Sequence, residues 1–149
     1  MNTAKIRQDS IDVALEALNC HVNGDRIEAA RMIMNHVEET GYMGIIFLLT
    51  TWLDTILLVT GKTPDKNKPK KLSWVSETGD HFDEADDVPE DSRWAGRMLS
   101  ARYAEDSEMF LDLIESIPPE HGGRYLQTVL ESASLTVQIM SCIRREDHE

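Results

Sequence analysis

The feature that most constrains the fold is the stretch 42–60, which carries a single charged side chain, Asp54. Apolar residues recur three and four positions apart through the stretch, and this spacing predicts a helix. The apolar sector is wider than the stripe of an ordinary surface helix. A helix that is apolar on nearly every side is buried in a protein core or in a membrane. The rest of the chain must therefore cover this helix, or lipid must.

We favour a protein core over a membrane. A transmembrane helix needs about 20 apolar residues and disfavours a central charge. Here the uninterrupted apolar run is short, because Asp54 lies inside it and three threonines lie nearby. Gly61 follows and is expected to end the helix in a left-handed conformation.

Composition narrows the class of protein. A chain of 149 residues is expected to form one domain, 1–149, with a substantial core. The net charge of −12 argues against direct nucleic-acid binding, because phosphate contacts require basic surfaces. The N-terminal residues lack the apolar core of a signal peptide, and Cys20 and Cys142 have no CxxC spacing. We therefore expect a cytoplasmic protein with reduced thiols.

Helix-capping and helix-breaking residues along the chain predict six main helices and an all-α fold. Ser10 is expected to cap the first helix, and Asp25, with Glu28 three residues later, forms a capping box for the second. Gly41 is expected to stop that helix just before 42–60. Helices resume at 92, restart at Asp106, end at the prolines 118–119 and begin again after the glycines 122–123.

The segment 61–91 has no helical or strand periodicity and reads as a long charged linker. Its first half is basic and its second half is acidic, and three prolines interrupt the segment. Trp74 and Phe82 are its candidate anchors. A connection of this length is often functional. The simpler interpretation is a solvated tether that its opposite charges make compact.

The two helical halves resemble each other at a constant offset of 81 residues, without a gap. Ala14 then matches Ala95, Asp25 matches Asp106, and Gly41 matches Gly122. Eight identities fall in 9–59 against 90–140, where chance gives about three to four. We therefore predict two pseudo-equivalent three-helix repeats, about 9–60 and about 92–143, in one bundle-like domain.

Sequence signals for catalysis are weak. The chain has no glycine-rich phosphate loop and no nucleophile elbow. Asp54 could be a site acid with a raised pKa, but we favour a surface-facing position or an ion pair with Arg93 or Arg97. His36 with Glu39, or His81 with neighbouring carboxylates, could bind a metal, but the paired motifs of metal-binding bundles are absent. We therefore expect no cofactor and no metal site.

The function that the sequence favours is a non-enzymatic protein-interaction module that self-associates as a homodimer through its apolar helices, with no membrane partner. The helix 42–60 is expected to be the main core or interface element. One alternative is an acidic inhibitor that mimics nucleic acid and binds a basic protein. Another is a carboxylate-dependent metal enzyme of the all-α type. The candidate interaction residues are the aromatic and acidic side chains of the central helix and the linker: Trp52, Asp54, Trp74, Phe82, Asp83, Glu84, Asp86 and Asp87.

Overall fold

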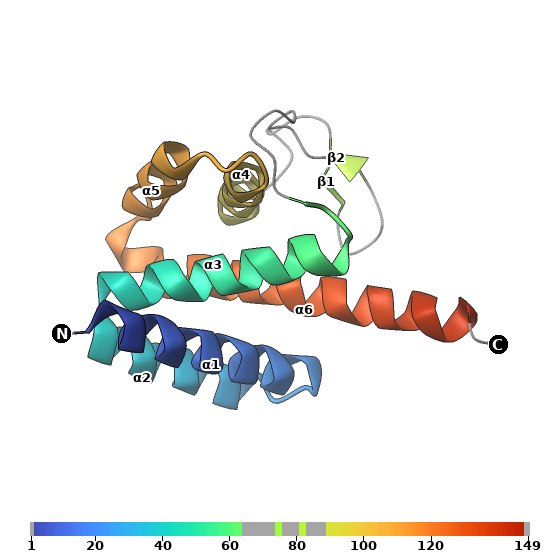
Figure 1. The fold of residues 1–149 in the computed structure, drawn as a ribbon, viewed down its shortest axis with the longest axis horizontal. Coiled ribbons are helices and arrows are strands. Elements are labelled where there is room, and N and C mark those ends of the chain that lie inside the picture. Colours follow the sequence, from blue (N-terminus) through green and yellow to red (C-terminus); the bar gives the residue numbers. More distant parts are fainter. Residues whose placement is uncertain (1, 64–73, 76–80, 83–88, 148–149) are drawn as a thin grey trace. The chain divides into compact units, whose positions relative to one another are not determined.

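The computed structural model describes residues 2–63, 74–75, 81–82 and 89–147, and helices dominate them (Figure 1). The described part contains six α-helices, one short 3₁₀-helix and two strands of two residues each, which confirms the all-α class. In chain order the elements are α1 (Thr3–Val22), α2 (Arg26–Thr40), α3 (Tyr42–Val59), β1 (Trp74–Val75), β2 (His81–Phe82), α4 (Glu90–Tyr103), α5 (Ser107–Glu115), η2 (Pro119–His121) and α6 (Gly122–Asp147).

The chain divides into two compact units. Unit 1 comprises residues 1–62 and 129–149, and unit 2 comprises residues 63–128. The boundary falls inside α6, so the beginning of this helix belongs to unit 2 and the remainder to unit 1.

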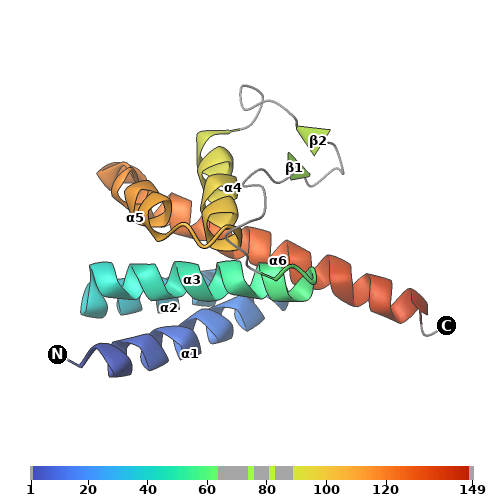
Figure 2. The ribbon, with the colours of Figure 1, turned by 45° about the horizontal axis from the view of Figure 1, so that its top comes forward.

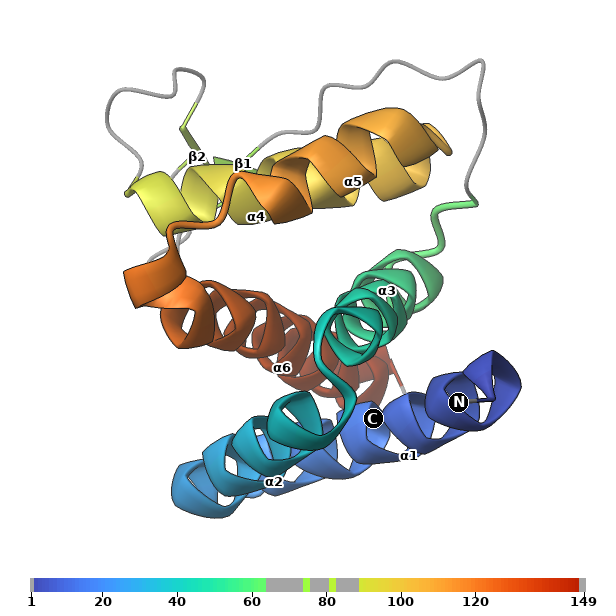
Figure 3. The same ribbon diagram turned by 90° about the vertical axis from the view of Figure 1, so that its left-hand side faces the viewer.

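In unit 1, α1 and α2 form a helical hairpin, and both contact α3 (Figure 3). The buried side chains of α3 are a tryptophan and five aliphatic residues: Leu48, Leu49, Trp52, Leu53, Ile56 and Leu57. From α1, Ala14 and Ala17 are fully buried, and such small side chains let helices approach closely. The Trp52 indole N–H donates to the Ala14 carbonyl at 2.9 Å, so this buried ring leaves no polar atom unsatisfied.

The glycines on either side of α3 have the expected role. Gly41 has φ 65° and ψ −140°, a conformation open essentially to glycine alone, and it lets α3 start without a loop after α2. Gly61 follows the cap residue Thr60 with φ 73°, which confirms the predicted left-handed end of the central helix.

The start of α1 corrects a prediction. Asn2, not Ser10, caps the helix, because its side-chain oxygen accepts the Ala4 N–H at 2.9 Å. Ser10 lies within α1 and is fully buried. The polar residues before it are exposed and simply extend the helix outward from its buried face.

In unit 2, α4 and α5 form a second helical hairpin. The Trp94 indole N–H donates to the Leu113 carbonyl at 2.7 Å, which joins the two helices. The Trp94 ring also packs against Tyr125 of α6, with ring centroids 5.1 Å apart. Nearby, the buried Asp91 accepts the Thr128 hydroxyl at 2.6 Å.

In the segment expected to lack structure, β1 and β2 pair antiparallel, with Trp74 opposite Phe82.

The α1–α2 and α4–α5 hairpins turn with the same hydrogen bonds. In the first, Asp25 N donates to Cys20 O at 2.8 Å and Gly24 N donates to His21 O at 3.1 Å. In the second, Asp106 N donates to Ala101 O at 2.8 Å and Glu105 N donates to Arg102 O at 3.1 Å. Each is the pair of bonds that closes a helix through a left-handed residue.

The aspartates that end these turns also cap the following helices. The Asp25 carboxylate accepts the Glu28 N–H at 3.3 Å, and the Asp106 carboxylate accepts the Met109 N–H at 3.0 Å. Both caps were predicted from the sequence. The left-handed positions differ, because Gly24 has φ 88° whereas Glu105, with φ 54°, is the one described residue other than glycine with a positive φ.

By length and composition α3 could cross a membrane, and 39% of its apolar window is buried inside the protein. It is the one described helix with this property.

We predict that Leu49→Asp unfolds unit 1. Leu49 is fully buried, so the substitution both leaves a cavity and buries an unpaired charge, at a cost of at least about 4 kcal/mol. The matched control is Leu58→Asp on the same helix, where the side chain is 80% exposed. It should change stability by no more than about 0.5 kcal/mol. Urea unfolding followed by circular dichroism compares the two, and equal effects would contradict the assigned burial of α3.

We also predict opposite effects at the two left-handed positions. Glu105→Gly should stabilise the protein by about 0.5–1 kcal/mol, because glycine adopts positive φ without strain. Gly24→Ala should destabilise it by about 1 kcal/mol for the same reason, since a methyl group there meets no atom within 4 Å. Thermal unfolding of both variants measures these two changes in stability. A stabilising Gly24→Ala, or a destabilising Glu105→Gly, would be inconsistent with these turns.

Candidate functional site

Two buried serine–histidine pairs are the main polar features inside unit 1. Ser10 Oγ of α1 lies 2.7 Å from His36 Nε2 of α2. His21 Nδ1 of α1 lies 2.8 Å from Ser134 Oγ of α6. Because histidine can activate a serine hydroxyl as a nucleophile, the direction of each proton decides what the pairs can do.

Ser10 is a structural residue. Its Oγ also lies 2.6 Å from the Ile6 carbonyl oxygen, which can only accept a hydrogen bond. The hydroxyl proton therefore points to Ile6, and His36 Nε2–H donates to Ser10. A catalytic histidine must instead take the serine proton.

His21 is held as a buried neutral ring. Ser134 Oγ accepts the Gln138 side-chain amide at 3.0 Å and shares a hydrogen bond of 2.8 Å with His21 Nδ1. The other ring nitrogen, His21 Nε2, is buried without a hydrogen-bond partner. Burial lowers the pKa of His21, the Arg26 guanidinium lowers it further, and Glu131 acts in the opposite direction. Ser134 is fully buried, so no substrate can reach this pair.

Neither cysteine has the setting of an activated thiol. Burial raises the pKa of the half-buried Cys20 thiol, and the neighbouring carboxylates of Asp25, Glu28 and Glu16 raise it further. A cysteine nucleophile requires the opposite shift. Cys142 is exposed near the end of α6, and the two thiols are free.

A pocket of about 300 Å³ opens between α1 and α2. Three carboxylates line it, together with one buried imidazole and two small side chains: Asp9, Asp12 and Val13 from α1, and His36, Glu39 and Thr40 from α2. No lysine or arginine is among these lining residues. The pocket therefore offers hydrogen-bond acceptors almost exclusively.

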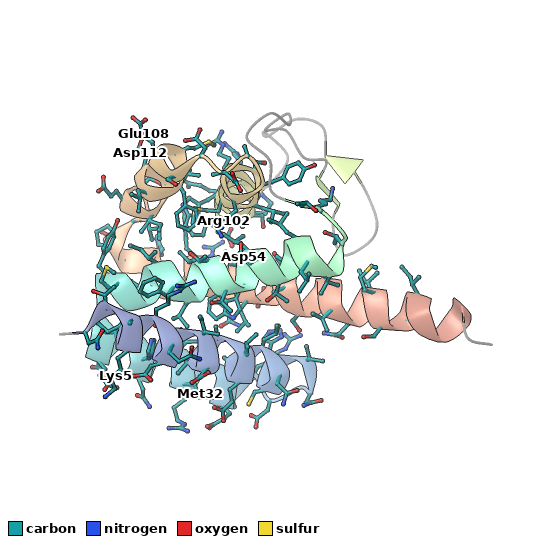
Figure 4. All side chains as sticks on the ribbon, in the orientation of Figure 1. Lys5, Met32, Asp54, Arg102, Glu108 and Asp112 are labelled. Atoms are coloured by element: carbon teal, nitrogen blue, oxygen red, sulfur yellow. The ribbon has the colours of Figure 1, made fainter. Side chains whose placement is uncertain are left out.

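A second pocket, of about 420 Å³, lies on unit 2. It combines one guanidinium, three carboxylates and a partly apolar floor: Arg97 of α4 with Asp106, Glu108, Met109, Asp112, Leu113 and Ser116 of the α5 region. Glu108 and Asp112 project from the outer side of α5 (Figure 4). This mixture of charges does not select one ligand chemistry.

Large apolar side chains are exposed on all four helices of unit 1, including Leu15 on α1. Ile27 and Met34 project from α2, Leu58 projects from the end of α3, and Ile139 and Ile143 project from α6. The α6 pair lies one helical turn apart, on one face.

The structure separates the candidate interaction residues of the central helix. Trp52 has no exposed surface, so it lies in the core of unit 1, and its role in an interaction stays a prediction. Asp54 is half-buried on α3 (Figure 4) and interacts with other groups of the chain.

The candidates in the linker are less defined. Trp74 and Phe82 are register partners in the β1–β2 pair, and their side chains lie outside the described part of the chain. Asp83, Glu84, Asp86 and Asp87 also lie outside the described residues, as does the side chain of His81.

Within residues 2–63 and 89–143, no three His, Cys, Asp or Glu side chains are arranged to hold a metal ion. His36 and Glu39, proposed as one metal-binding combination, instead line the acidic pocket, where Ser10 occupies the imidazole Nε2.

Sequence reasoning missed both serine–histidine pairs and the pocket. A signal was available, because Ser10, Ala14, Ala17 and His21 fall on one helical face, so the periodicity places two polar residues among buried positions. Their partners lie 26 and 113 residues away, beyond any local pattern.

Comparison with known proteins adds no identification: no protein-family model, no curated protein and no solved structure matches this chain.

We predict that His21 makes the fold less stable in acid. Its pKa is lower in the folded chain than in the unfolded one, so the unfolded state binds the proton first and stability falls as pH drops below about 6.5. His21→Gln removes this contribution and keeps a polar side chain near Ser134. In urea unfolding between pH 8 and pH 5, the free energy of unfolding should fall less toward low pH for the variant than for the unmodified protein. Identical pH profiles would contradict the buried neutral imidazole.

Proposed function

We propose that this protein is a non-enzymatic interaction module that self-associates as a homodimer through the C-terminal part of α6. The observation that carries the proposal is a run of twelve residues of α6, 132–143, without a charged side chain, in which the exposed positions are 138, 139 and 141–143. At the chain average of 28% charged residues, about three charges are expected in twelve positions. Solvent-facing helical surfaces usually carry such charges.

The exposed side chains of this run are apolar or uncharged. Ile139 and Ile143 are about half exposed, and Gln138, Ser141 and Cys142 lie beside them. The surface resembles the centre of a protein–protein interface, where charged residues are depleted. Two copies of one helix face make an isologous contact, the commonest form of self-association.

The end of α6 is sterically available for such a contact. In Figures 1 and 2 the last turns of α6 extend past the end of α3 within unit 1. A second α6 could lie against this segment and cover the Ile139–Ile143 face. In this proposal α3 supplies the core, and its exposed Leu58 is at most a peripheral contact.

We also propose that the chain contains two copies of a three-helix unit at the offset of 81 residues, joined by the charged linker. The two hairpin turns support this, because their paired hydrogen bonds and their aspartate caps correspond at that offset. So do Gly24 and Glu105, the two left-handed residues.

The third helices correspond as well. The Thr55 hydroxyl bonds the Thr51 carbonyl at 2.8 Å, and the Thr136 hydroxyl bonds the Ser132 carbonyl at 2.7 Å. Leu49 and Leu130, also 81 positions apart, are both fully buried. Leu58 and Ile139 correspond too, and both are exposed. The proposed interface is thus a position at which both copies carry a surface aliphatic residue.

Of the alternatives, the acidic inhibitor stays a prediction, because its residues lie outside the described part of the chain. The metal-enzyme alternative lacks support, because the described residues contain no cluster of metal ligands.

The free thiols Cys20 and Cys142 support a reducing location, and we propose that the protein acts in the cytoplasm.

The test is the mass of the particle in solution. Sedimentation equilibrium of the full chain should give twice the chain mass of 16.9 kDa. Ile139→Glu combined with Ile143→Glu should give the single-chain mass, because two buried carboxylates per copy would face the same groups of the other copy.

The matched control is Ile27→Glu combined with Met34→Glu, which places two charges on α2 at apolar side chains that are more exposed than the α6 pair. It should leave the mass unchanged. A single-chain mass for the unmodified protein at millimolar concentration would refute self-association. A monomer produced by the α2 variant, and not by the α6 variant, would move the interface to α2.

A further inference from the structure

We propose that the His21–Ser134 pair is an acid-sensitive latch, which holds the C-terminal part of α6 against α1 and releases it when the imidazole gains a proton. Both residues belong to unit 1, so the contact lies within one compact part of the chain. The latch needs no second copy of the chain and does not depend on the self-association proposed above.

The pair lies where α6 leaves the core. The described α6 side chains that are buried in unit 1 are three apolar residues and one serine: Val129, Leu130, Ala133 and Ser134. Ser134 is the last of them, and every side chain from 135 to 143 is half-buried or exposed. The hydrogen bond of 2.8 Å between Ser134 Oγ and His21 Nδ1 therefore forms at the end of the packed part of the helix.

A charged imidazole does not fit this position. An imidazolium carries a proton on both ring nitrogens, so both must donate a hydrogen bond. His21 Nε2 is buried without a hydrogen-bond partner, and the residue is only 6% exposed. A buried charged donor that has no acceptor is strongly unfavourable, whichever nitrogen holds the single proton of the neutral ring. Protonation therefore drives the ring toward water and away from Ser134.

The path of the ring to water is short. His21 lies in the last turn of α1, which ends at Val22. The three residues that follow are exposed, and one of them is a glycine with a positive φ: Asn23, Gly24 and Asp25. The ring therefore reaches solvent through a rearrangement of one helical turn, and the part of α1 that covers α3 keeps its place.

Charged groups around His21 act in both directions. The Arg26 guanidinium at the start of α2 disfavours a second positive charge, whereas Glu131 of α6 favours it. The last turn of α1 also favours a cation, because the free carbonyl groups of a helix end are partly negative. The pKa of His21 is nonetheless lowered, with burial as the largest cause, so the latched ring is neutral near pH 7.

The other carboxylates of this region do not offset that burial. On α3 the one charged side chain is Asp54, which projects from the side of the helix opposite α1 (Figure 4). Three further carboxylates near the end of α1 act on the neighbouring Cys20 thiol: Glu16, Asp25 and Glu28. Glu131 is thus the carboxylate that acts on the His21 ring.

Acid favours the released state. A released His21 is exposed to water and titrates near the ordinary pKa of about 6.5, whereas the latched ring has a lower pKa. The released state therefore binds the proton first. Between pH 7.5 and pH 5.0 its population relative to the latched state should rise by at least about fivefold and at most about thirtyfold.

Hydrogen exchange tests the latch on the full-length chain in its single-chain form, either dilute or carrying Ile139→Glu and Ile143→Glu. A released helix end frays in water, so its amides lose protection. After correction for the intrinsic pH dependence of exchange, the amides of 133–138 should lose protection by the factor given above. They should also exchange faster than the α3 amides of 48–57 at both pH values, because release is a local opening.

Variants of the two histidines separate the latch from a general effect of acid. His21→Gln removes the titrating group, so the acid loss at 133–138 should fall below about twofold. His36→Gln is the matched control, because His36 is equally buried but bonds Ser10 of α1, and the response of α6 should be unchanged. Ser134→Ala removes the hydrogen bond from the α6 side and should lower protection of these amides already at pH 7.5.

One comparison needs no variant and decides the matter if His21→Gln does not fold. In the unmodified chain the loss of protection at 133–138 should begin below about pH 6.5 and continue until the His21 ring titrates in the folded protein. The resonance of the His21 Cε1 proton reports that titration. A loss that begins or ends outside this interval would contradict the latch.

Three other results would overturn the proposal. One is protection at 133–138 that does not change with pH, and another is an equal acid loss in a folded His21→Gln variant. The third is protection of 133–138 equal to that of 48–57, because α6 would then leave α1 only through global unfolding. The mass of the particle enters none of these measurements, so failure here leaves self-association untouched, and the converse also holds.

Discussion

The burial of α3 is the constraint on which the rest of the structure depends. A helix this apolar requires cover, and α1 supplies it with two alanines that allow close approach. The Trp52 indole then bonds the Ala14 carbonyl, so the largest side chain in the core is fixed in position as well as buried. A large ring gains from burial only when its N–H finds an acceptor. Two other buried positions of α1 hold the polar residues Ser10 and His21, whose side chains find their partners on other helices.

The elements that the sequence predicted are those with local causes. The Asp25 and Asp106 caps and the Gly41 and Gly61 boundaries each depend on a few adjacent residues, and each was found as predicted. Ser10 was misplaced because a serine near an acidic residue looks like a cap, whereas Asn2 already performed that function. The histidine pairs and the acidic pocket could not be predicted, because they join α1 to residues of α2 and α6 that only the tertiary fold brings together.

The two helical hairpins solve the same packing problem with different chemistry. The first joins α1 to α2 through the buried Ser10–His36 pair and leaves a small polar opening. The second joins α4 to α5 through Trp94. Its indole N–H donates to the Leu113 carbonyl, and its ring packs against Tyr125.

Hydrogen exchange in aqueous buffer without detergent tests the burial of α3 most directly. Backbone amides are protected in proportion to the free energy of the opening that exposes them, so core helices exchange last. The account predicts that the amides of residues 48–57 exchange only through global unfolding, together with those of α1 around Ala14. The last turns of α6 should exchange far sooner whenever the chain is monomeric. Protection of α3 that is no greater than that of the α6 end, or that arises only when lipid is added, would contradict a helix covered by its own chain.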